Sequence, residues 1–413
     1  MSAIGRRVNR AALLVGAALA IVFGGSPRAI AQCHNTFNFG TGSVGPGGIK
    51  TLTPTTSPLI SITNTVNTAF FTNTTAFVSA PGGPKPDQDT GGVWVRTVGG
   101  VVDSEAKTVD LPTSLPQLGL PPSGEQVCHQ SSNHAYTGVQ VGADIGKLNI
   151  GSSGAAVHFG IMSGLLTASA KDTTPGVTRF GPGGGIDLGN TYAPGDFTAD
   201  FRVPFLGAYS VFTQGNFAAD VQVRWDWYES RSFSPGNNYA GLVNNAQGVS
   251  VAGGVYYRLV LQNWFAEPSV GGVWSRVQVD PFATPLALGG AATGVLRIED
   301  IESLLGRASV RVGVNLTQGM YTWQPFVVAS VIREFYGDVM STLSISDPGL
   351  IPGLFDAGVF TSSTSRVGTY GQFGAGMSVV AGNTGWLGYA RVDMKRGENV
   401  DGLGVNMGLR YQW

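Results

Sequence analysis

The chain has 413 residues, of which only 12% are charged, and its net charge is −1 at pH 7. A soluble protein usually carries about twice that charged fraction, and a disordered chain contains few aromatic residues, whereas here aromatic residues make up 10% and glycine occupies 61 positions. The composition therefore argues against an ordinary soluble surface and against disorder, and the near-neutral charge gives no indication of nucleic-acid binding.

The N-terminus has the parts of a secretory signal peptide. Three arginines precede the apolar run AALLVGAALAIVFGG, and Ala29 and Ala31 place small residues at the two positions that a signal peptidase reads. The alternative is a membrane-spanning helix, for which the apolar run is too short. We predict a signal peptide over residues 1–31 and therefore an exported protein.

The region that follows is rich in Thr, Asn, Ser, Gly and Pro and shows no strand alternation. Some of its apolar residues recur at roughly helical spacing: Ile62, Val66, Phe70 and Phe77. Many neighbours are β-branched, which lowers the helix propensity. The breaker PGGPKPDQDTGG then precedes the first strand candidate. We therefore divide the region into a short N-terminal segment, 32–56, and a helix with its linker, 57–91.

Alternating apolar and polar residues predict twelve β-strands in the remainder of the chain. No apolar run after the signal peptide approaches the length of a membrane-spanning helix. Because only helices and closed barrels satisfy every backbone group in lipid, this charge-poor, exported chain predicts an all-β, antiparallel transmembrane barrel over 92–413. A soluble β-sandwich is the alternative. The strands are expected near 92–103, 135–148, 155–171, 198–213, 216–229, 248–260, 263–279, 306–317, 320–335, 367–380, 385–396 and 402–413.

Short and long connections alternate along these strands. The connections after the even-numbered strands are short, such as TQGN at 213–216 and AGNTG at 381–385, and most of those after the odd-numbered strands are long. The connection GENVD, after the eleventh strand, is a short exception. Outer-membrane barrels have this rhythm of long outer loops and short periplasmic turns, and a sandwich has no reason for it. The rhythm therefore favours the barrel.

The alternation also assigns side chains to the two faces of the wall. In FAADVQVRWDW (217–227) and RASVRVGVNL (307–316), one parity is apolar and predicts the lipid face, while the other is polar. The predicted lumenal side chains are Asp220, Gln222, Arg224, Asp226, Arg307, Ser309, Arg311, Asn315, Arg391, Asp393 and Lys395. One strand changes phase at Gly271-Gly272, which predicts a β-bulge there.

Several of these strands together resemble the C-terminal translocator of the autotransporter family. The similar stretches are GVWVRTVGG, YTGVQVGADIG, FAEPSVGGVWSRVQVD, LLGRASVRVGVNL, QPFVVASVIREFYGD and YARVDMKRGENVDGLGVNMGLRYQW, in the family's order and spacing. The resemblance implies a twelve-stranded barrel with a helix threaded through its lumen, and the segment around 57–80 lies where that helix is expected. Two features depart from the family: residues 32–56 are too few for a large passenger, and the Asn-Asn pair at which some members cleave themselves is missing from the helical segment.

The chain ends inside a strand pattern, GLGVNMGLRYQW. As the closing strand, it is expected to pair with GVWVRTVGG so that no sheet edge remains. Trp413 then lies in the aromatic girdle at the periplasmic rim, with its ring in lipid and its N–H toward water. The resemblance implies that Leu409, Tyr411 and Trp413 form the signal read by the barrel-assembly machinery, with periplasmic chaperones as further partners.

Few residues suit catalysis or metal binding. Of the four histidines, only His158 is expected in the lumen, by its parity with Gly160 and Met162, and we interpret it as structural. The spacing supports neither a Ser-His site nor an Asp-His site of the kind that enzymatic barrels use. Export favours a disulfide between Cys33 and Cys128 over a zinc site. We therefore expect this disulfide, no metal, no cofactor and no enzyme activity.

These patterns predict a protein of the outer membrane of a Gram-negative bacterium. We expect a monomeric barrel surrounded by outer-membrane lipid, with no nucleic-acid partner. The function implied by the resemblance is insertion in the outer membrane and passage of the short N-terminal segment to the cell surface. The alternatives are an outer-membrane pore or surface-interaction protein without cargo export and, more distantly, a soluble periplasmic β-protein.

Overall fold

The computed structural model describes residues 37–38, 43–44, 52–71, 84–110, 126–175, 195–235, 239–285, 293–346, 358–382 and 384–413. All of them belong to the compact unit Ala31–Trp413. Near the N-terminus, β1 (Phe37–Asn38) pairs with β2 (Ser43–Val44). The predicted signal-peptidase residues Ala29 and Ala31 lie outside the described residues, as do Cys33, His34 and Phe77.

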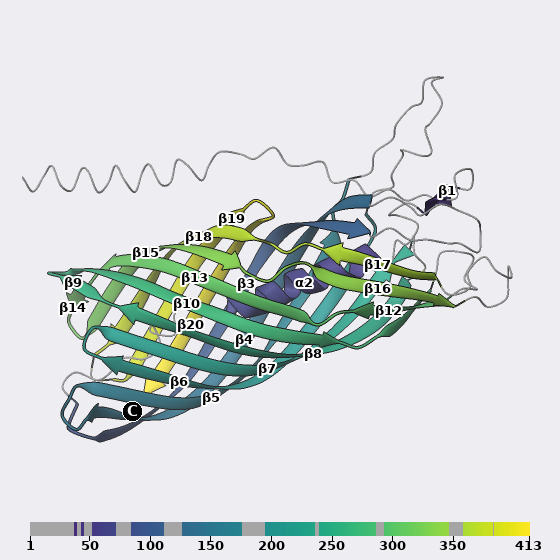
Figure 1. The fold of residues 1–413 in the computed structure, drawn as a ribbon. Helices are drawn as coiled ribbons and strands as arrows, with labels where there is room; N and C mark the ends of the chain where they lie inside the picture. Colours follow the sequence, from purple (N-terminus) through teal and green to yellow (C-terminus); the bar gives the residue numbers. More distant parts are fainter. Residues whose placement is uncertain are drawn as a thin grey trace, which may run out of the picture. The chain divides into compact units, whose positions relative to one another are not determined.

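Twelve antiparallel strands close into a barrel (Figure 1). The first five are β3 (Gln88–Asp110), β4 (Gln126–Ile150), β5 (Ala155–Asp172), β6 (Thr198–Gln214) and β7 (Phe217–Ser234). The next five consist of consecutive segments: β8 (Tyr239–Tyr257) with β9 (Leu259–Leu261), β10 (Trp264–Val279) with β11 (Phe282–Pro285), β12 (Thr293–Ile298) with β13 (Ile301–Val314) and β14 (Leu316–Gln318), β15 (Tyr321–Glu334) with β16 (Val339–Ser346), and β17 (Gly358–Thr364) with β18 (Thr369–Ala381). The last two are β19 (Trp386–Gly397) and β20 (Val400–Gln412).

All twelve predicted strands are confirmed, but several are longer than predicted. β3 continues to Asp110 and β4 begins at Gln126, so most of the connection expected between them is paired strand. The short turns are confirmed, and two of them place glycine at positive φ, Gly215 at 57° and Gly319 at 60°. Glycine suits such tight hairpins because it has no Cβ to clash in this backbone region.

The barrel closes through its first and last strands, as predicted. β20 pairs with β3 from Val400↔Ser104 to Gln412↔Gly92. Beyond this ladder, the Trp413 N–H donates to the Gly91 carbonyl at 3.0 Å and the Gly91 N–H donates to the Trp413 carbonyl at 3.2 Å. The carboxyl terminus therefore lies at the end of the barrel that carries the short turns, called here the short-turn end. The opposite end is the long-loop end.

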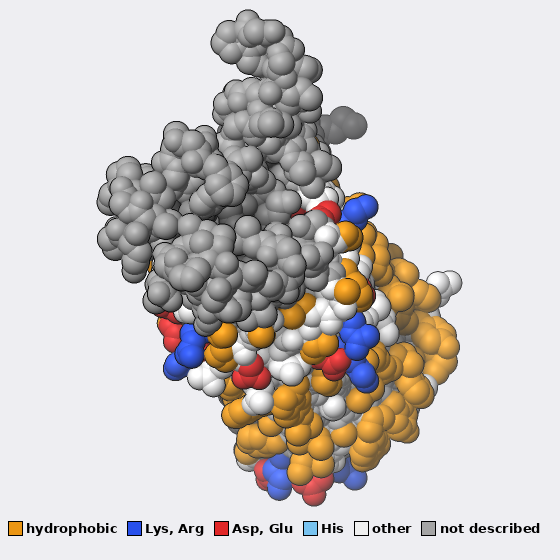
Figure 2. All heavy atoms as spheres, turned by 90° about the vertical axis from the view of Figure 1, so that its right-hand side faces the viewer, with side chains coloured by type: hydrophobic (Ala, Val, Ile, Leu, Met, Phe, Trp, Pro, Cys, Tyr) orange, Lys and Arg blue, Asp and Glu red, His pale blue; other side chains and the backbone are white. Residues whose placement is uncertain are grey.

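The predicted faces are also confirmed. Along β7, Val223 and Trp225 point outward, while Gln222, Arg224 and Asp226 are buried in the lumen. On β13, Val312 is outward and Arg311 is buried. Figure 2 shows hydrophobic side chains over much of the barrel wall, with charged side chains in separate groups. This apolar wall is the surface that contacts lipid.

The predicted β-bulge at Gly271-Gly272 is wrong. The ladder of β10 runs without a register shift past both glycines, on the β8 side and on the β13 side. The apparent change of phase arises because Val273 and Val277, which follow the glycines, are apolar residues that point into the lumen. They belong to the hydrophobic cluster that surrounds a helix inside the barrel.

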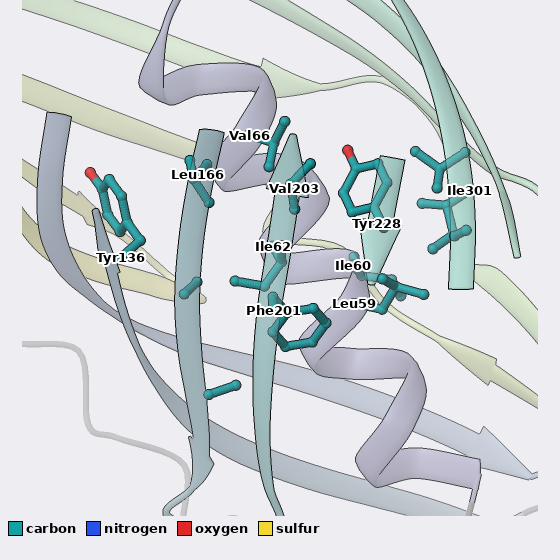
Figure 3. Packing of buried hydrophobic residues seen from close by; sticks show 14 of the residues in the cluster. Leu59, Ile60, Ile62, Val66, Tyr136, Leu166, Phe201, Val203, Tyr228 and Ile301 are labelled. Atoms are coloured by element: carbon teal, nitrogen blue, oxygen red, sulfur yellow. The ribbon is translucent and has the colours of Figure 1, made fainter. Parts of the chain in front are cut away.

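That helix is α2 (Leu52–Ala69), which lies in the lumen toward the long-loop end (Figure 1). The predicted lumenal helix is thus confirmed, although it begins at Leu52 rather than near residue 57 and ends before residue 80. Ile62 and Val66 are fully buried against Phe201 and Val203 of β6 and Leu166 of β5 (Figure 3). In the part of the chain that the structure describes, no helix has the length and apolar character needed to cross a bilayer.

Candidate functional site: the lumen around α2

The sequence of α2 is a poor helix former by itself. It contains Pro58 and many Thr residues, and it has no acidic residue in its first turn and no basic residue in its last turn. Thr63 donates its hydroxyl to the Leu59 carbonyl and Thr68 donates to the Asn64 carbonyl, each at 2.9 Å. Such bonds satisfy the hydroxyls but do not add helix stability. The stability of α2 must therefore come from the barrel around it.

Three arginines from different strands bind the C-terminal carbonyls of α2 and of the two residues that follow it. Arg96 of β3 donates to the Phe70 carbonyl at 2.7 Å. Arg224 of β7 donates to the Val66 carbonyl at 3.2 Å, and Arg307 of β13 donates to the Phe71 carbonyl at 3.2 Å. The last carbonyls of a helix have no partner within the helix and carry partial negative charge. These three arginines, called here the arginine collar, supply the cap that α2 itself lacks.

Phe70 and Phe71 fit into two sockets of the wall. A Cβ on Gly138 would lie 3.1 Å from Cζ of Phe70, and a Cβ on Gly271 would lie 3.1 Å from Cζ of Phe71. These distances are tighter than ordinary van der Waals contact, so each glycine leaves room for a ring, and at Gly271 also for the Gly253 carbonyl oxygen, 2.7 Å from the same point. The guanidinium groups of the collar lie over the same rings, at 5.2 Å for Phe70 and 4.5 Å for Phe71. The ring of Phe70 also packs 5.1 Å from that of Phe205.

Polar contacts continue along the helix. The Asn67 amide donates to the Ser275 hydroxyl at 2.8 Å, and Nζ of Lys395 donates to the Thr68 hydroxyl at 3.2 Å. Nearer the N-terminal end of α2, the hydroxyls of Thr56 and Ser341 lie 2.9 Å apart. Ser341 belongs to β16, which lies toward the long-loop end. The N-terminal end of α2 therefore points to the long-loop end, and its C-terminal end points to the short-turn end.

Buried ion pairs fill the rest of the lumenal wall. Arg224 pairs with Asp226 at 2.6 Å, Arg311 with Glu267 at 2.8 Å, Nε of Arg391 with Asp393 at 2.6 Å and Arg410 with Asp144 at 2.6 Å. Charges buried this deeply must be paired to offset their desolvation. The pairs confirm the mixed-charge lumen that the sequence predicts, and their donors and acceptors hold the wall in one arrangement around the helix.

His158 is buried in the lumen, as its parity predicts. Its Nδ1 lies 3.1 Å from the Asp144 carboxylate, which also accepts bonds from Arg410 and from the Tyr209 hydroxyl at 2.7 Å. His134 contacts the hydroxyls of Ser104 and Ser132 at 3.1 and 2.8 Å. Within the described ranges, no group of three or more His, Cys, Asp or Glu side chains is arranged to hold a metal ion.

The other predicted site residues lie on β20 and β4 or outside the described residues. Leu409, Tyr411 and Trp413 share the outward parity at the short-turn end, and the rings of Tyr411 and Trp413 are 6.0 Å apart. Cys128 is part of β4, where it pairs with Thr108 of β3. Its predicted partner Cys33 lies outside the described residues, so the disulfide stays a prediction.

The comparison with protein families identifies the chain. The model of the autotransporter beta-domain matches residues 128–393. This chain belongs to the autotransporter beta-domain family. It is accordingly an autotransporter-type barrel of the outer membrane of a Gram-negative bacterium, with lipid around its wall.

Three solved autotransporter structures are similar to this chain, and the first of them shows the same fold. The transport unit of the autotransporter AIDA-I from Escherichia coli has a TM-score of 0.57 and 14% identity, over 87% of this chain and 98% of that one. The beta domain of the Bordetella autotransporter BrkA has a TM-score of 0.49 and 18% identity, over 78% and 98% of the two chains. The translocator domain of NalP from Neisseria meningitidis has a TM-score of 0.46 and 13% identity, over 76% and 88%. A comparison with curated proteins finds no match.

Two parts of the autotransporter lumen were not predicted from the sequence. Arg96 was not expected to bind the helix, although it has the parity opposite to Val93 and Val95. Gly271 was expected to form a bulge, and Gly138 had no predicted role. A glycine with inward parity in an otherwise regular strand was the available signal, because a missing Cβ leaves room for something in the lumen.

Proposed function

We propose that this barrel carries the part of the N-terminal segment 32–56 that precedes α2 to the cell surface and that α2 then stays in the lumen as a plug. In this proposal residues 1–31 are removed as a signal peptide, and the stretch 57–91 contains most of the plug and its linker. The short segment is the only cargo that we assign to the chain.

The observation that carries this proposal is the direction and docking of α2. The helix is held at its C-terminal end by the arginine collar and the two Phe sockets, and its other end points to the long-loop end. In outer-membrane barrels the long loops lie outside the cell. In this proposal, the chain that precedes Leu52 therefore leaves the lumen on the outer side. Because α2 makes these contacts inside the lumen, the structure also argues against the alternative of an open pore.

Surface proteolysis of intact cells tests the proposal. An epitope inserted after Thr41 is expected to be removed by a protease that does not cross the outer membrane. The matched control is the same epitope in the turn between Gln214 and Phe217 at the short-turn end, which should be cleaved only after the outer membrane is permeabilised. Protection of the Thr41 epitope in intact cells, together with a folded barrel, would show that the segment is not exported.

The outward row Leu409, Tyr411 and Trp413 supports a second part of the proposal, recognition by the barrel-assembly machinery. Side chains on this row are exposed on the outer wall, and the adjoining ring of Trp386 lies 5.0 Å from that of Tyr411. An aromatic edge at the end of the closing strand offers a recognition surface before the barrel closes. Periplasmic chaperones would deliver the unfolded chain to this step.

We also propose that the barrel acts without catalysis. His158 is held by Asp144, and that carboxylate is bonded to Arg410 and Tyr209. This arrangement orients a buried histidine within an ion-pair network, which is a structural task. Assays of the purified protein for hydrolysis of peptide and phospholipid substrates test this part, and turnover that is lost in His158→Gln would contradict it.

A further inference from the structure

One edge of β3 changes its partner partway along the strand. From Gly92 to Ser104 that edge pairs with β20. The Glu105 N–H then donates to the Asn399 carbonyl at 2.9 Å, and Lys107 and Ser365 bind each other through two bonds of 2.8 Å. From Thr108 to Asp110 the same edge pairs with β17. The hairpin of β19 and β20 thus ends before the long-loop end of β3. Beyond the tip of that hairpin, β17 pairs with β3 directly.

This crossing narrows the barrel at the long-loop end. Twelve strands form the wall near the short-turn end, and removing β19 and β20 leaves ten (12 − 2 = 10) in the part called here the neck. Because the diameter of a barrel grows roughly linearly with strand number, the neck is narrower by about one-sixth. The short connection GENVD, which breaks the rhythm of long outer loops, is the sequence signature of this neck.

The β3–β17 ladder differs from the other ladders of the neck. It contains three residue pairs, whereas β11–β12 has four, β12–β16 has six and β16–β17 has seven. Among the described strands, all the other adjacent pairs of strands in the neck stay paired further along, toward the short-turn end. Below their three pairs, however, β17 and β3 diverge: β18, which continues β17, pairs with β15 and β19. Separation of β3 from β17 therefore breaks no ladder of the lower wall.

The neck also touches the plug. α2 lies against β16, β17 and β3, and Thr56 contacts Ser341 of β16. At the joint itself, the buried hydroxyls of Thr108 and Thr364 are 3.2 Å apart. The nearby Ser362 hydroxyl is buried without a hydrogen-bond partner. Movement of β17 away from β3 would loosen the wall on one side of α2.

We propose that the pairing of β3 residues 107–110 with residues 362–365 is the joint that sets the width of the outer mouth and opens to let a polypeptide segment of this chain pass. The inference rests on the proposed function for its cargo, but the opening itself is a property of the barrel. Only a small number of hydrogen bonds closes the ten-stranded mouth at this joint, and breaking them would widen it.

Hydrogen exchange of the full chain in lipid nanodiscs is the first test. Because N–H groups alternate between the two edges of a strand, only the amides of Lys107, Val109, Ser363 and Ser365 point into the joint. These amides are expected to exchange much faster than the amides of 92–104 that bond to β20. They should also exchange faster than those of 126–130, which pair with the opposite edge of β3 at the same height. Equal protection of these stretches would overturn the proposal.

A disulfide lock is the second test. In a Cys33→Ser, Cys128→Ser background, Thr108→Cys with Thr364→Cys bridges the joint, since these residues are direct partners in the ladder. The control pair, Ala106→Cys with Gln130→Cys, bridges the ordinary β3–β4 ladder. Heat-modifiability on gels confirms that both barrels are folded.

Planar-bilayer recordings of the full chain then measure opening. Current fluctuations under applied voltage should disappear when the joint is oxidised, return on reduction and persist in the control pair. The proposal would be overturned if the protein without native cysteines shows no current fluctuations. It would also be overturned if the disulfide across the joint leaves the fluctuations unchanged. Failure of the proposed function is seen separately, as protection of the Thr41 epitope, because the current requires no export.

Discussion

Phe70→Ala should release the plug without unfolding the barrel. Phe70 is fully buried at the end of α2, where its ring contacts Phe205, the guanidinium of Arg96 and the space left by Gly138. Truncating a buried Phe to Ala costs about 3–5 kcal/mol. The strands do not depend on this ring for their ladders, so the loss falls on the docking of α2.

The expected increase in the undocked population of α2 follows from that energy. Since about 1.4 kcal/mol corresponds to a factor of ten in an equilibrium, the undocked population of α2 should rise roughly 10²-fold or more. A reporter cysteine, Ser61→Cys, lies on the buried helix. In a background without Cys33 and Cys128, its labelling by a maleimide should accelerate by the same factor if labelling requires undocking.

The matched control is Phe159→Ala, which removes the same ring from the lipid face, where Phe159 is 61% exposed. Labelling of Ser61→Cys should be unchanged in that control. Both variants should remain heat-modifiable, which verifies the barrel. If Phe70→Ala and Phe159→Ala label at the same rate as the parent, the socket does not hold the plug, and the reasoning from ring burial to docking fails.

Three further predictions concern the wall, the cysteines and the terminus. Val312→Arg should lower the yield of folded barrel, because an Arg facing lipid at mid-depth costs about 2–4 kcal/mol, while Ser309→Arg in the lumen should be milder; equal losses would contradict the assigned faces. Cys33 and Cys128 should resist maleimide in unreduced protein, and free thiols would refute the disulfide. Deleting Trp413 should slow membrane insertion while signal-peptide cleavage continues, and insertion at the parental rate would exclude an assembly signal.

The strands and their faces follow from the sequence because strand periodicity is local. A strand turns successive side chains to opposite sides, so the parity of Val223 and Arg224 could be assigned without knowing their neighbours. Closure of the barrel was predictable as well, since an unpaired edge cannot be left in lipid. The lumenal helix was predicted from the spacing of Ile62, Val66 and Phe70, and more specifically from the family resemblance.

The tertiary structure alone decided what each lumenal side chain binds. The partner of Arg96 is a carbonyl of α2, and the role of Gly271 is to make room for Phe71, because the helix places these groups opposite residues far away in the sequence. The ends of α2 likewise depend on where the collar caps it rather than on its own weak propensity. The β3–β17 pairing was equally hidden, since which strand meets the upper edge of β3 depends on where the last hairpin ends in space, and no local pattern encodes that distance.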